Sequence, residues 1–112
     1  MDKRQPEHII CDGYEMWLMP GVGRHREDGP AYIGDNGGKS WWINGKLHRL
    51  DGPAIEYAGG AKEWWVNGIR HRTDGPAAEW PSGIKDWYVD GVKIECENNE
   101  QFLRLMKLRV FW

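Results

Sequence analysis

Residues 48–54 read His-Arg-Leu-Asp-Gly-Pro-Ala, and the same phrase, with one variable position, stands at residues 25–31 and 71–77. Successive copies are 23 residues apart. A second phrase, two aromatic residues followed by an aliphatic residue, Asn or Asp, and Gly, keeps this spacing at residues 41–45, 64–68 and 87–91. A fixed period of this length is typical of a repeat array in which each unit is one small supersecondary structure. The phrase therefore predicts the shape of the protein more clearly than its function.

The period divides the chain into four repeats, at residues 6–29, 30–52, 53–75 and 76–97. The first repeat is degenerate, because Trp17 lies 24 residues before Trp41 and the extra residue falls in the loop at 20–24. The His-Arg phrase is missing before the first repeat and after the last one, as expected of terminal repeats that cap an array. For a chain of 112 residues we expect a single domain, residues 1–112.

Within a repeat the pattern predicts two strands, for example at residues 54–57 and 62–66, followed by a loop at 67–75. Asn-Gly favours positive φ and a tight primed turn, Asp-Gly favours the same, and Pro fixes the start of the next strand. A short additional strand at 69–71 is an alternative. We therefore expect a mostly β fold, a single-layer antiparallel meander of hairpin repeats with about eight strands.

Two rows of aromatic residues follow from the alternation of side chains between the faces of a strand. One face carries the inner row (Trp17, Trp41, Trp64 and Trp87), with Met19, Ile43, Val66 and Val89 beside it. We expect this face to form a continuous core. The opposite face carries the outer aromatic row (Trp42, Trp65 and Tyr88), with Leu18 at the same position of the first repeat.

The C-terminal segment predicts an α-helix at about 98–110. Asn98 is suited to the N-cap and Gln101 to the third helical position, as in a capping box. Such a helix is about 20 Å long at 1.5 Å per residue. It can therefore cover about two repeats of one face, and the sequence leaves open which face that is.

The composition argues against several classes of partner. A formal net charge of −2 provides no overall attraction to nucleic acid. The first residues lack the apolar core of a signal peptide, and no apolar run is long enough to span a membrane. We therefore expect a cytoplasmic protein without membrane contact.

The two cysteines, Cys11 and Cys96, fall in the first and last repeats. Repeats of two strands stack about 9.6 Å apart, which separates these residues by about 29 Å in an open sheet. A disulfide requires Cα atoms within about 7 Å. We expect two free thiols.

These repeats resemble the MORN class, whose units combine an aromatic strand, an Asn-Gly-x-x-His turn and a closing Gly turn. The match is Trp-x-x-Asn-Gly-x-x-His at 41–48 and 64–71, and the resemblance covers residues 6–97. The chain departs from the usual pattern after the His, where Arg-x-Asp-Gly-Pro-Ala stands. This variant is similar to repeats of small phage and giant-virus proteins and of bacterial antitoxins. The resemblance implies a small inhibitor or neutraliser of another protein, either a phage anti-defence protein of the anti-CRISPR type or an antitoxin.

The histidine row (His25, His48 and His71) raises the question of a metal site. Rows about 9.6 Å apart cannot bring their nitrogens together on one ion, because zinc holds each ligand nitrogen at about 2.1 Å. We expect each His to pack on the next repeat or to bond loop backbone. No metal and no other cofactor is expected.

The arginine row (Arg26, Arg49 and Arg72) stands two residues before an Asp in each phrase. Its simplest interpretation is structural, because the Asp can satisfy turn N–H groups and the Arg can pair with an Asp. The alternative is a basic ladder, joined by Lys39, Lys62 and Lys85, that binds an anionic ligand.

Catalysis finds no support in the motifs. The chain contains no Gly-x-Ser-x-Gly, no phosphate loop and no His-Glu-x-x-His, the patterns that position nucleophiles, phosphates and metals. We expect a protein that is not an enzyme.

The outer aromatic row is the sharpest functional signal. Each ring offers about 150–250 Å², so three in a line exceed the few hundred Å² of contiguous apolar surface that monomers usually expose. Either the C-terminal helix buries this row, or a partner covers it. The predicted partner-binding residues are Trp42, Trp65, Tyr88, Arg26, Arg49, Arg72, His48 and His71.

The predicted partner is a protein, and the resemblance implies a bacterial defence effector or a toxin. A homodimer through the aromatic face or the C-terminal helix is an alternative. A rival hypothesis is sequestration of an anionic nucleotide, with Arg and Lys holding phosphate and aromatic rings stacking on the base.

Overall fold

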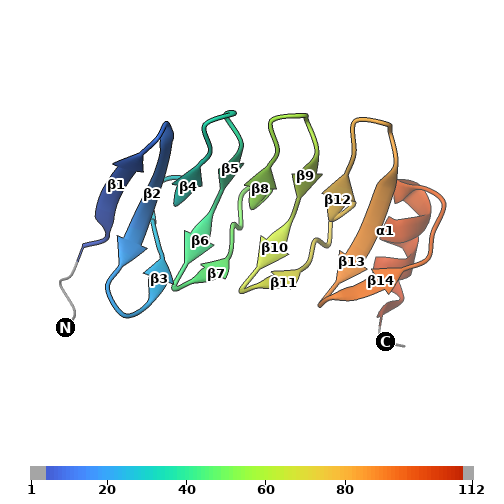
Figure 1. Ribbon diagram of the computed structural model, residues 1–112. Coiled ribbons are helices and arrows are strands. Elements are labelled where there is room, and N and C mark those ends of the chain that lie inside the picture. Colours follow the sequence, from blue (N-terminus) through green and yellow to red (C-terminus); the bar gives the residue numbers. More distant parts are fainter. Residues whose placement is uncertain (1–4, 110–112) are drawn as a thin grey trace.

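A computed structural model describes residues 5–109, which form an open antiparallel meander that ends in one helix (Figure 1). The first repeat contains β1 (Glu7–Cys11), β2 (Tyr14–Met19) and β3 (Gly23–Arg24). The second contains β4 (Tyr32–Ile33), β5 (Lys39–Ser40), β6 (Trp42–Ile43) and β7 (Lys46–Leu47). The third contains β8 (Ile55–Glu56), β9 (Lys62–Glu63), β10 (Trp65–Val66) and β11 (Ile69–Arg70). The fourth contains β12 (Ala78–Glu79), β13 (Lys85–Val89) and β14 (Val92–Ile94), and α1 (Asn99–Lys107) follows.

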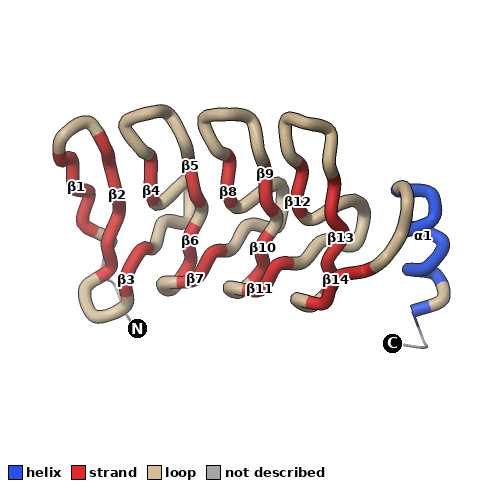
Figure 2. Tube along the Cα trace, turned by 45° about the vertical axis from the view of Figure 1, so that its right-hand side comes forward, coloured by secondary structure: helices blue, strands red, loops and turns tan. Residues whose placement is uncertain are grey.

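Each internal repeat consists of two hairpins, which Figure 1 shows one above the other. We call β4-β5 and β8-β9 the upper hairpins, and β6-β7 and β10-β11 the lower hairpins. The upper hairpins join into one ten-stranded sheet in the order β1-β2-β4-β5-β8-β9-β12-β13-β14, with β3 paired to β2. The lower hairpins of the second and third repeats, β6-β7 and β10-β11, form separate two-stranded sheets. Figure 2 shows the upper and lower hairpins repeating side by side along the array. The expected meander is confirmed.

The described residues contain more strands than the eight expected, and the inner row explains the difference. The long second strand of the internal repeats is interrupted at Trp41 and Trp64. There the backbone N–H donates to the next repeat instead, with Trp41 N at 2.8 Å from the Ala54 carbonyl. In addition, the short strand considered at 69–71 forms as β11.

The lower turns have the expected backbone. Asn44, Asn67 and Asp90 adopt φ of +51°, +52° and +52°, and the glycine after each lies at +77° to +80°. Two successive residues with positive φ are typical of the primed turns that match the twist of a hairpin.

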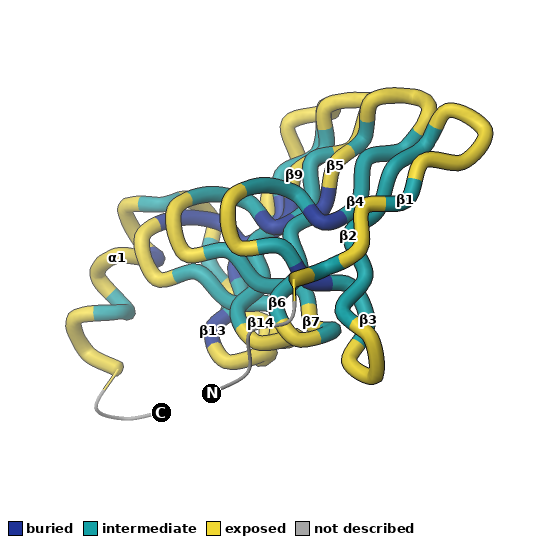
Figure 3. The backbone as a smooth tube through the Cα atoms, turned by 90° about the vertical axis from the view of Figure 1, so that its left-hand side faces the viewer, coloured by how far each residue is buried: buried dark blue, intermediate teal, exposed yellow. Residues whose placement is uncertain are grey.

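The centre of the array is built from small residues. Ala31, Ala54 and Ala77 are fully buried, and each exchanges backbone hydrogen bonds with its neighbours, such as Ala54 N to the Glu63 carbonyl at 2.8 Å. Figure 3 shows the buried backbone concentrated along this line, with the loops exposed around it.

The expectation that the inner row forms a continuous core is wrong for three of its four members. Only Trp87 and its neighbour Val89 are buried, at 6 % and 4 % exposed, whereas the first three Trp residues are half-buried. The reason is that the sheet is open and the one helix covers the fourth repeat alone.

Helix α1 begins as predicted and covers less than predicted. The Asn98 side chain accepts a hydrogen bond from Gln101 N at 2.8 Å, and the Gln101 side chain accepts from Glu97 N at 2.9 Å. The helix ends at Lys107 rather than 110, and residue 110 lies outside the described part. Phe102, fully buried, packs with Trp87 and Val89. The helix therefore lies on the inner face, so the hypothesis that it buries the outer aromatic row is wrong.

Cys11 at the end of β1 and Cys96 after β14 are free thiols at opposite ends of the array. Between residues 5 and 109 no helix is long and apolar enough to cross a membrane.

Candidate functional site

The outer aromatic row is half-buried on the face that α1 does not cover, and its indoles are fixed in place. Trp42 Nε1 donates to Ser40 Oγ at 2.8 Å. One repeat later Trp65 Nε1 donates to Glu63 Oε1 at 3.0 Å. The acceptor stands two residues before the indole in both cases, because residues two apart on a strand share a face. The rings are thus oriented before any partner arrives.

Arginine side chains lie between these rings. The Arg24 guanidinium carbon lies 4.5 Å from the ring centroid of Tyr32 and 5.1 Å from that of Trp42. Arg70 lies between Trp65 and Tyr88, at 5.0 and 4.9 Å. A guanidinium within about 6 Å of a ring face is attracted by the ring quadrupole.

On the outer face two arginines are thus inserted between aromatic rings, Arg24 between Tyr32 and Trp42 and Arg70 between Trp65 and Tyr88. Arg24, Leu47, Arg70 and Lys93 occupy equivalent positions one period apart. The sequence reasoning missed Arg24 and Arg70, although their separation of two periods was visible. The proximity of Arg70 to Trp65 depends on the pairing of β10 with β11, which sets these residues opposite each other, and Arg24 is placed by the pairing of β2 with β3.

A buried carboxylate anchors the middle of this face. Glu63 is 7 % exposed and accepts hydrogen bonds from Tyr57 Oη at 2.7 Å, Trp65 Nε1 at 3.0 Å and Arg70 Nη2 at 2.6 Å. Burial alone would raise the pKa of Glu63, but these donors lower it overall. Burial and the bond to Glu63 raise the pKa of Tyr57 to about 12. The cluster therefore holds Glu63 ionised and Tyr57 protonated at neutral pH.

A shallow groove of about 370 Å³ opens on the outer face between the second and third repeats. Its lining combines three aromatic rings with aliphatic and cationic groups, among them Tyr32, Trp42, Tyr57, Leu47, Ile55 and Arg24. Such a mixture of aromatic residues and arginine is enriched in protein interfaces.

The histidine row is structural. His25, His48 and His71 each accept, through Nδ1, the backbone N–H of the residue at the lower turn of the next repeat, at 2.9, 3.0 and 2.9 Å. Because Nδ1 is the acceptor in this bond, the tautomer that forms it carries its proton on Nε2. Each His thus joins one repeat to the next, as the sequence analysis expected.

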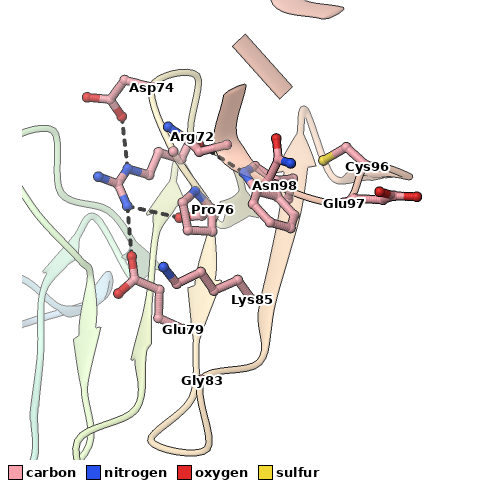
Figure 4. Close-up of a pocket in the computed structure, with 12 residues that line it drawn as sticks. Arg72, Asp74, Pro76, Glu79, Gly83, Lys85, Cys96, Glu97 and Asn98 are labelled. Atoms are coloured by element: carbon pink, nitrogen blue, oxygen red, sulfur yellow. Dashed lines mark hydrogen bonds and ion pairs between the residues drawn. The ribbon is translucent and has the colours of Figure 1, made fainter. Parts of the chain in front are cut away.

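The arginine row is also held by hydrogen bonds, in which each guanidinium is the donor. Each Nε donates to the Asp two residues on, and each Nη1 to the Pro carbonyl four residues on, as at Arg72 with 2.8 and 3.0 Å (Figure 4). Each guanidinium also stacks on an inner-row indole, at 3.8 to 4.0 Å for Trp17, Trp41 and Trp64. At Arg49 and Arg72 the Nη1 atom reaches a Glu as well, Glu56 at 3.2 Å and Glu79 at 3.3 Å.

This packing explains the glycine of the phrase. The expectation that Asp-Gly takes positive φ is wrong, since Gly29, Gly52 and Gly75 are not among the positive-φ residues. A Cβ at these positions would instead lie 2.7 to 3.0 Å from the guanidinium carbon of the stacked arginine. Glycine therefore leaves room for the stacked guanidinium, and a Cβ there would make the arginine side chain shift.

The predicted site is therefore divided between two faces. The outer aromatic row lies on one face with Arg24 and Arg70. The arginine row, His48 and His71 lie on the other, where they line grooves with the inner row. The described residues contain no cluster of three or more His, Cys, Asp or Glu side chains that could hold a metal ion.

Comparison with known proteins supplies no further assignment. No family model matches the chain, and the searches of curated proteins and of solved structures found no significant match.

Proposed function

We propose that the chain is a non-enzymatic protein-interaction module that binds a protein partner through the outer aromatic row. The observation that carries this proposal is the half-buried row of Trp42, Trp65 and Tyr88, with Arg24 and Arg70 stacked on its rings, on the face that α1 does not cover. Trp, Tyr and Arg are the residues most enriched in interface hot spots.

Preorganisation of the rings supports the same proposal. The Trp42 and Trp65 indoles are held by hydrogen bonds to Ser40 and Glu63. Binding usually costs about 0.5–1.5 kcal/mol for each flexible side chain that it immobilises. Rings that are already fixed avoid most of this cost, so a modest surface can bind tightly.

The consequence that we propose for such binding is neutralisation of the partner, a bacterial defence effector or a toxin, in the cytoplasm. This step rests on the resemblance to phage and antitoxin repeats. The rival nucleotide hypothesis is less favoured, because a phosphate would have to displace the Asp and Pro partners of the arginine row.

The test is affinity capture from bacterial lysates with the wild-type chain and with a Trp42→Ala, Trp65→Ala double variant, read by mass spectrometry. We expect one protein to be captured by the wild type and lost with the double variant. Ile84→Ala is the control, since Ile84 is an exposed apolar residue, at 57 %, that lies outside the row.

Circular dichroism and a thermal midpoint show whether the double variant remains folded. Loss of capture with Ile84→Ala as well, or capture that survives in a folded double variant, would contradict the proposal.

A further inference from the structure

The ten-stranded sheet has one open end. Its strand order begins at β1 and ends at β14. Figure 1 shows α1 and the loop before it at the C-terminal end of the array, whereas no described element lies beyond β1. β1 forms five consecutive residue pairs with β2, without a bulge. Natural edge strands are usually protected by Pro, charged side chains, bulges or very short length, and of these β1 has only Glu7 at its first residue.

The free side of β1 carries unpaired backbone groups. Trp17 N donates to the Ala31 carbonyl at 2.8 Å, and the Trp17 carbonyl accepts from His25 N at 3.0 Å. Both groups of Trp17 thus point away from His8, the residue opposite it on β1, and such a pair leaves the N–H and C=O of His8 on the free side of the strand. Because this orientation alternates along a strand, Ile10 also presents its N–H and C=O there. Within residues 5–109 these four groups have no hydrogen-bond partner.

The spacing of these groups matches a second copy of the same strand. When two β1 strands lie antiparallel about a two-fold axis at Ile9, His8 of each copy lies opposite Ile10 of the other. Both pairs are then of the hydrogen-bonded kind, so all four free groups of each copy find a partner. An axis at His8 would set Ile10 opposite Pro6, which has no N–H, and an axis at Ile10 would set His8 opposite Asp12 in the turn. Only the axis at Ile9 satisfies every group.

On the outer face, Ile9 is the last member of a row of paired residues. Strand pairing sets Ile9 beside Met16, and Met16 beside Tyr32. Met16 and Tyr32 are flanked on both sides, whereas Ile9 has no neighbour on the free side of β1 within the described chain. The axis at Ile9 sets the two copies of this isoleucine opposite each other, so the two rows join in an apolar contact.

On the inner face, the same arrangement covers exposed apolar surface. The His8 ring stacks on Trp17 with centroids 4.2 Å apart, and Ile10 is 69 % exposed. In the paired strands Ile10 of one copy lies beside His8 of the other and shields it. Glu7 faces Cys11 of the other copy, so like charges are not opposed.

We propose that β1 of one chain binds β1 of a second copy, antiparallel about a two-fold axis at Ile9, and joins the two ten-stranded sheets into one. The contact uses the same strand of both copies, so it is closed and association stops at a dimer. A contact of five residues per chain is small compared with the interfaces of stable complexes, so the dimer dissociates on dilution. It places both outer aromatic rows on the same face of one sheet. The inference goes beyond the proposed partner binding and does not depend on it.

Sedimentation equilibrium of the full chain over a range of concentrations measures this association. We expect the mass to rise from 13.0 kDa towards twice this value. Ile9→Lys and Ile9→Glu should each weaken dimerisation by about fivefold or more, because like charges directly opposite each other are destabilising. An equimolar mixture of the two variants should dimerise again as a mixed pair, since opposite charges then meet at the axis. A variant that merely loses its fold cannot be restored by mixing.

Ile84→Lys is the control, because Ile84 is exposed and lies outside β1, and it should dimerise like the wild type. The inference would be overturned by a mass that stays at 13.0 kDa at every concentration, or by folded Ile9 variants whose mixture is no more dimeric than either alone. Growth beyond the dimer would contradict the two-fold axis. A dimer that survives in both Ile9 variants and is lost with Trp42→Ala, Trp65→Ala would overturn the inference too, by assigning the contact to the outer aromatic row. Capture of a protein partner is measured separately and does not enter these outcomes.

Discussion

The third and fourth repeats carry the same pair of side chains on the inner face and cover them differently. Trp64 lies under the guanidinium of Arg72 and remains half-buried. Trp87 lies under Phe102 of α1 and is 6 % exposed. An arginine held by an Asp and a carbonyl thus serves as a lid inside the array, whereas the last repeat needs a whole helix. An internal repeat of this β-array is thus covered by an arginine of the repeated phrase, whereas the end of the array is covered by a separate helix.

Removing the Phe102 side chain, through which α1 covers Trp87, should have the largest effect on stability. Phe102→Ala is expected to lower the free energy of unfolding by about 3–5 kcal/mol, because it leaves a cavity against Trp87 and Val89. Urea unfolding measures the loss. Leu103→Ala is the control on the same helix, where the side chain is 40 % exposed. An equal loss for both variants would mean that Phe102 is not the anchor.

The buried carboxylate distinguishes the third repeat from its neighbours, which carry Ser40 and Asp86 at that position. Glu63→Gln is expected to cost about 1–3 kcal/mol, as for other buried hydrogen-bonded groups that lose a partner. Because the pKa of Glu63 is lowered in the folded state, its stabilisation is present above the unfolded value of about 4.3. It is lost as the pH falls through the folded value.

Unfolding curves between neutral and acidic pH therefore test this cluster. The wild type should lose its advantage over Glu63→Gln as the pH falls below about 4.3. A difference between the two proteins that stays constant over the whole range would contradict the ionised state of Glu63.

Replacing the arginine lid should have a smaller effect. Arg72→Lys is expected to cost about 1–2 kcal/mol, because Lys cannot reproduce the fork of hydrogen bonds or the stacking on the indole. Thermal and urea unfolding measure it. Arg104→Lys, an exposed helical position, should be neutral. A neutral Arg72→Lys would show that the lid does not depend on the guanidinium.

Substitution of Gly52, which lies next to the stacked Arg49, tests a steric contact rather than backbone strain. Gly52→Ala places a Cβ 3.0 Å from the Arg49 guanidinium carbon. Since a long side chain can shift, we expect a cost of about 0.5–1 kcal/mol, in line with the cost of moderately strained side-chain torsions. In an Arg49→Ala background the same substitution should change the free energy of unfolding very little. Additive losses in this double-mutant cycle would exclude the contact as the cause.

Nucleotides should have no effect. The partners of the arginine row are already in place, so we expect no shift of the thermal midpoint with a panel of mono- and dinucleotides at low salt. A stabilising shift that salt weakens would revive the nucleotide hypothesis.

The repeat period predicted the meander and the lower turns, and the capping pattern at Asn98 predicted the start of the helix, because these features depend on residues close in sequence. Glycine after Asn44 or Asn67 is enough to set a primed turn, and Asn98 with Gln101 is enough to start a helix. The sequence also predicted that each histidine would pack on the next repeat or bond loop backbone, and the structure shows the bond to backbone, accepted by Nδ1.

The repeat period could not predict which groups cover each face of the sheet. Alternation assigns Trp41 and Trp42 to opposite faces, but burial depends on whether an arginine, a helix or nothing covers the ring. The same limit hid the cations of the outer face, since Arg24 reaches Tyr32 and Trp42 only through strand pairing. It also hid the reason for Gly52, which is a contact with Arg49 rather than a turn.

The bond from each histidine to the next lower turn has a mechanical consequence. His48 reaches Asn67 and no further, so each repeat is coupled only to its neighbours. Such a chain behaves as a one-dimensional cooperative system whose stability is a sum of unit and interface terms. Pulled from its N-terminus, it should open one 23-residue unit at a time and resist longest at the helical end. Duplication of residues 53–75 should lengthen it by one identical step, because nothing in the array except α1 fixes its length.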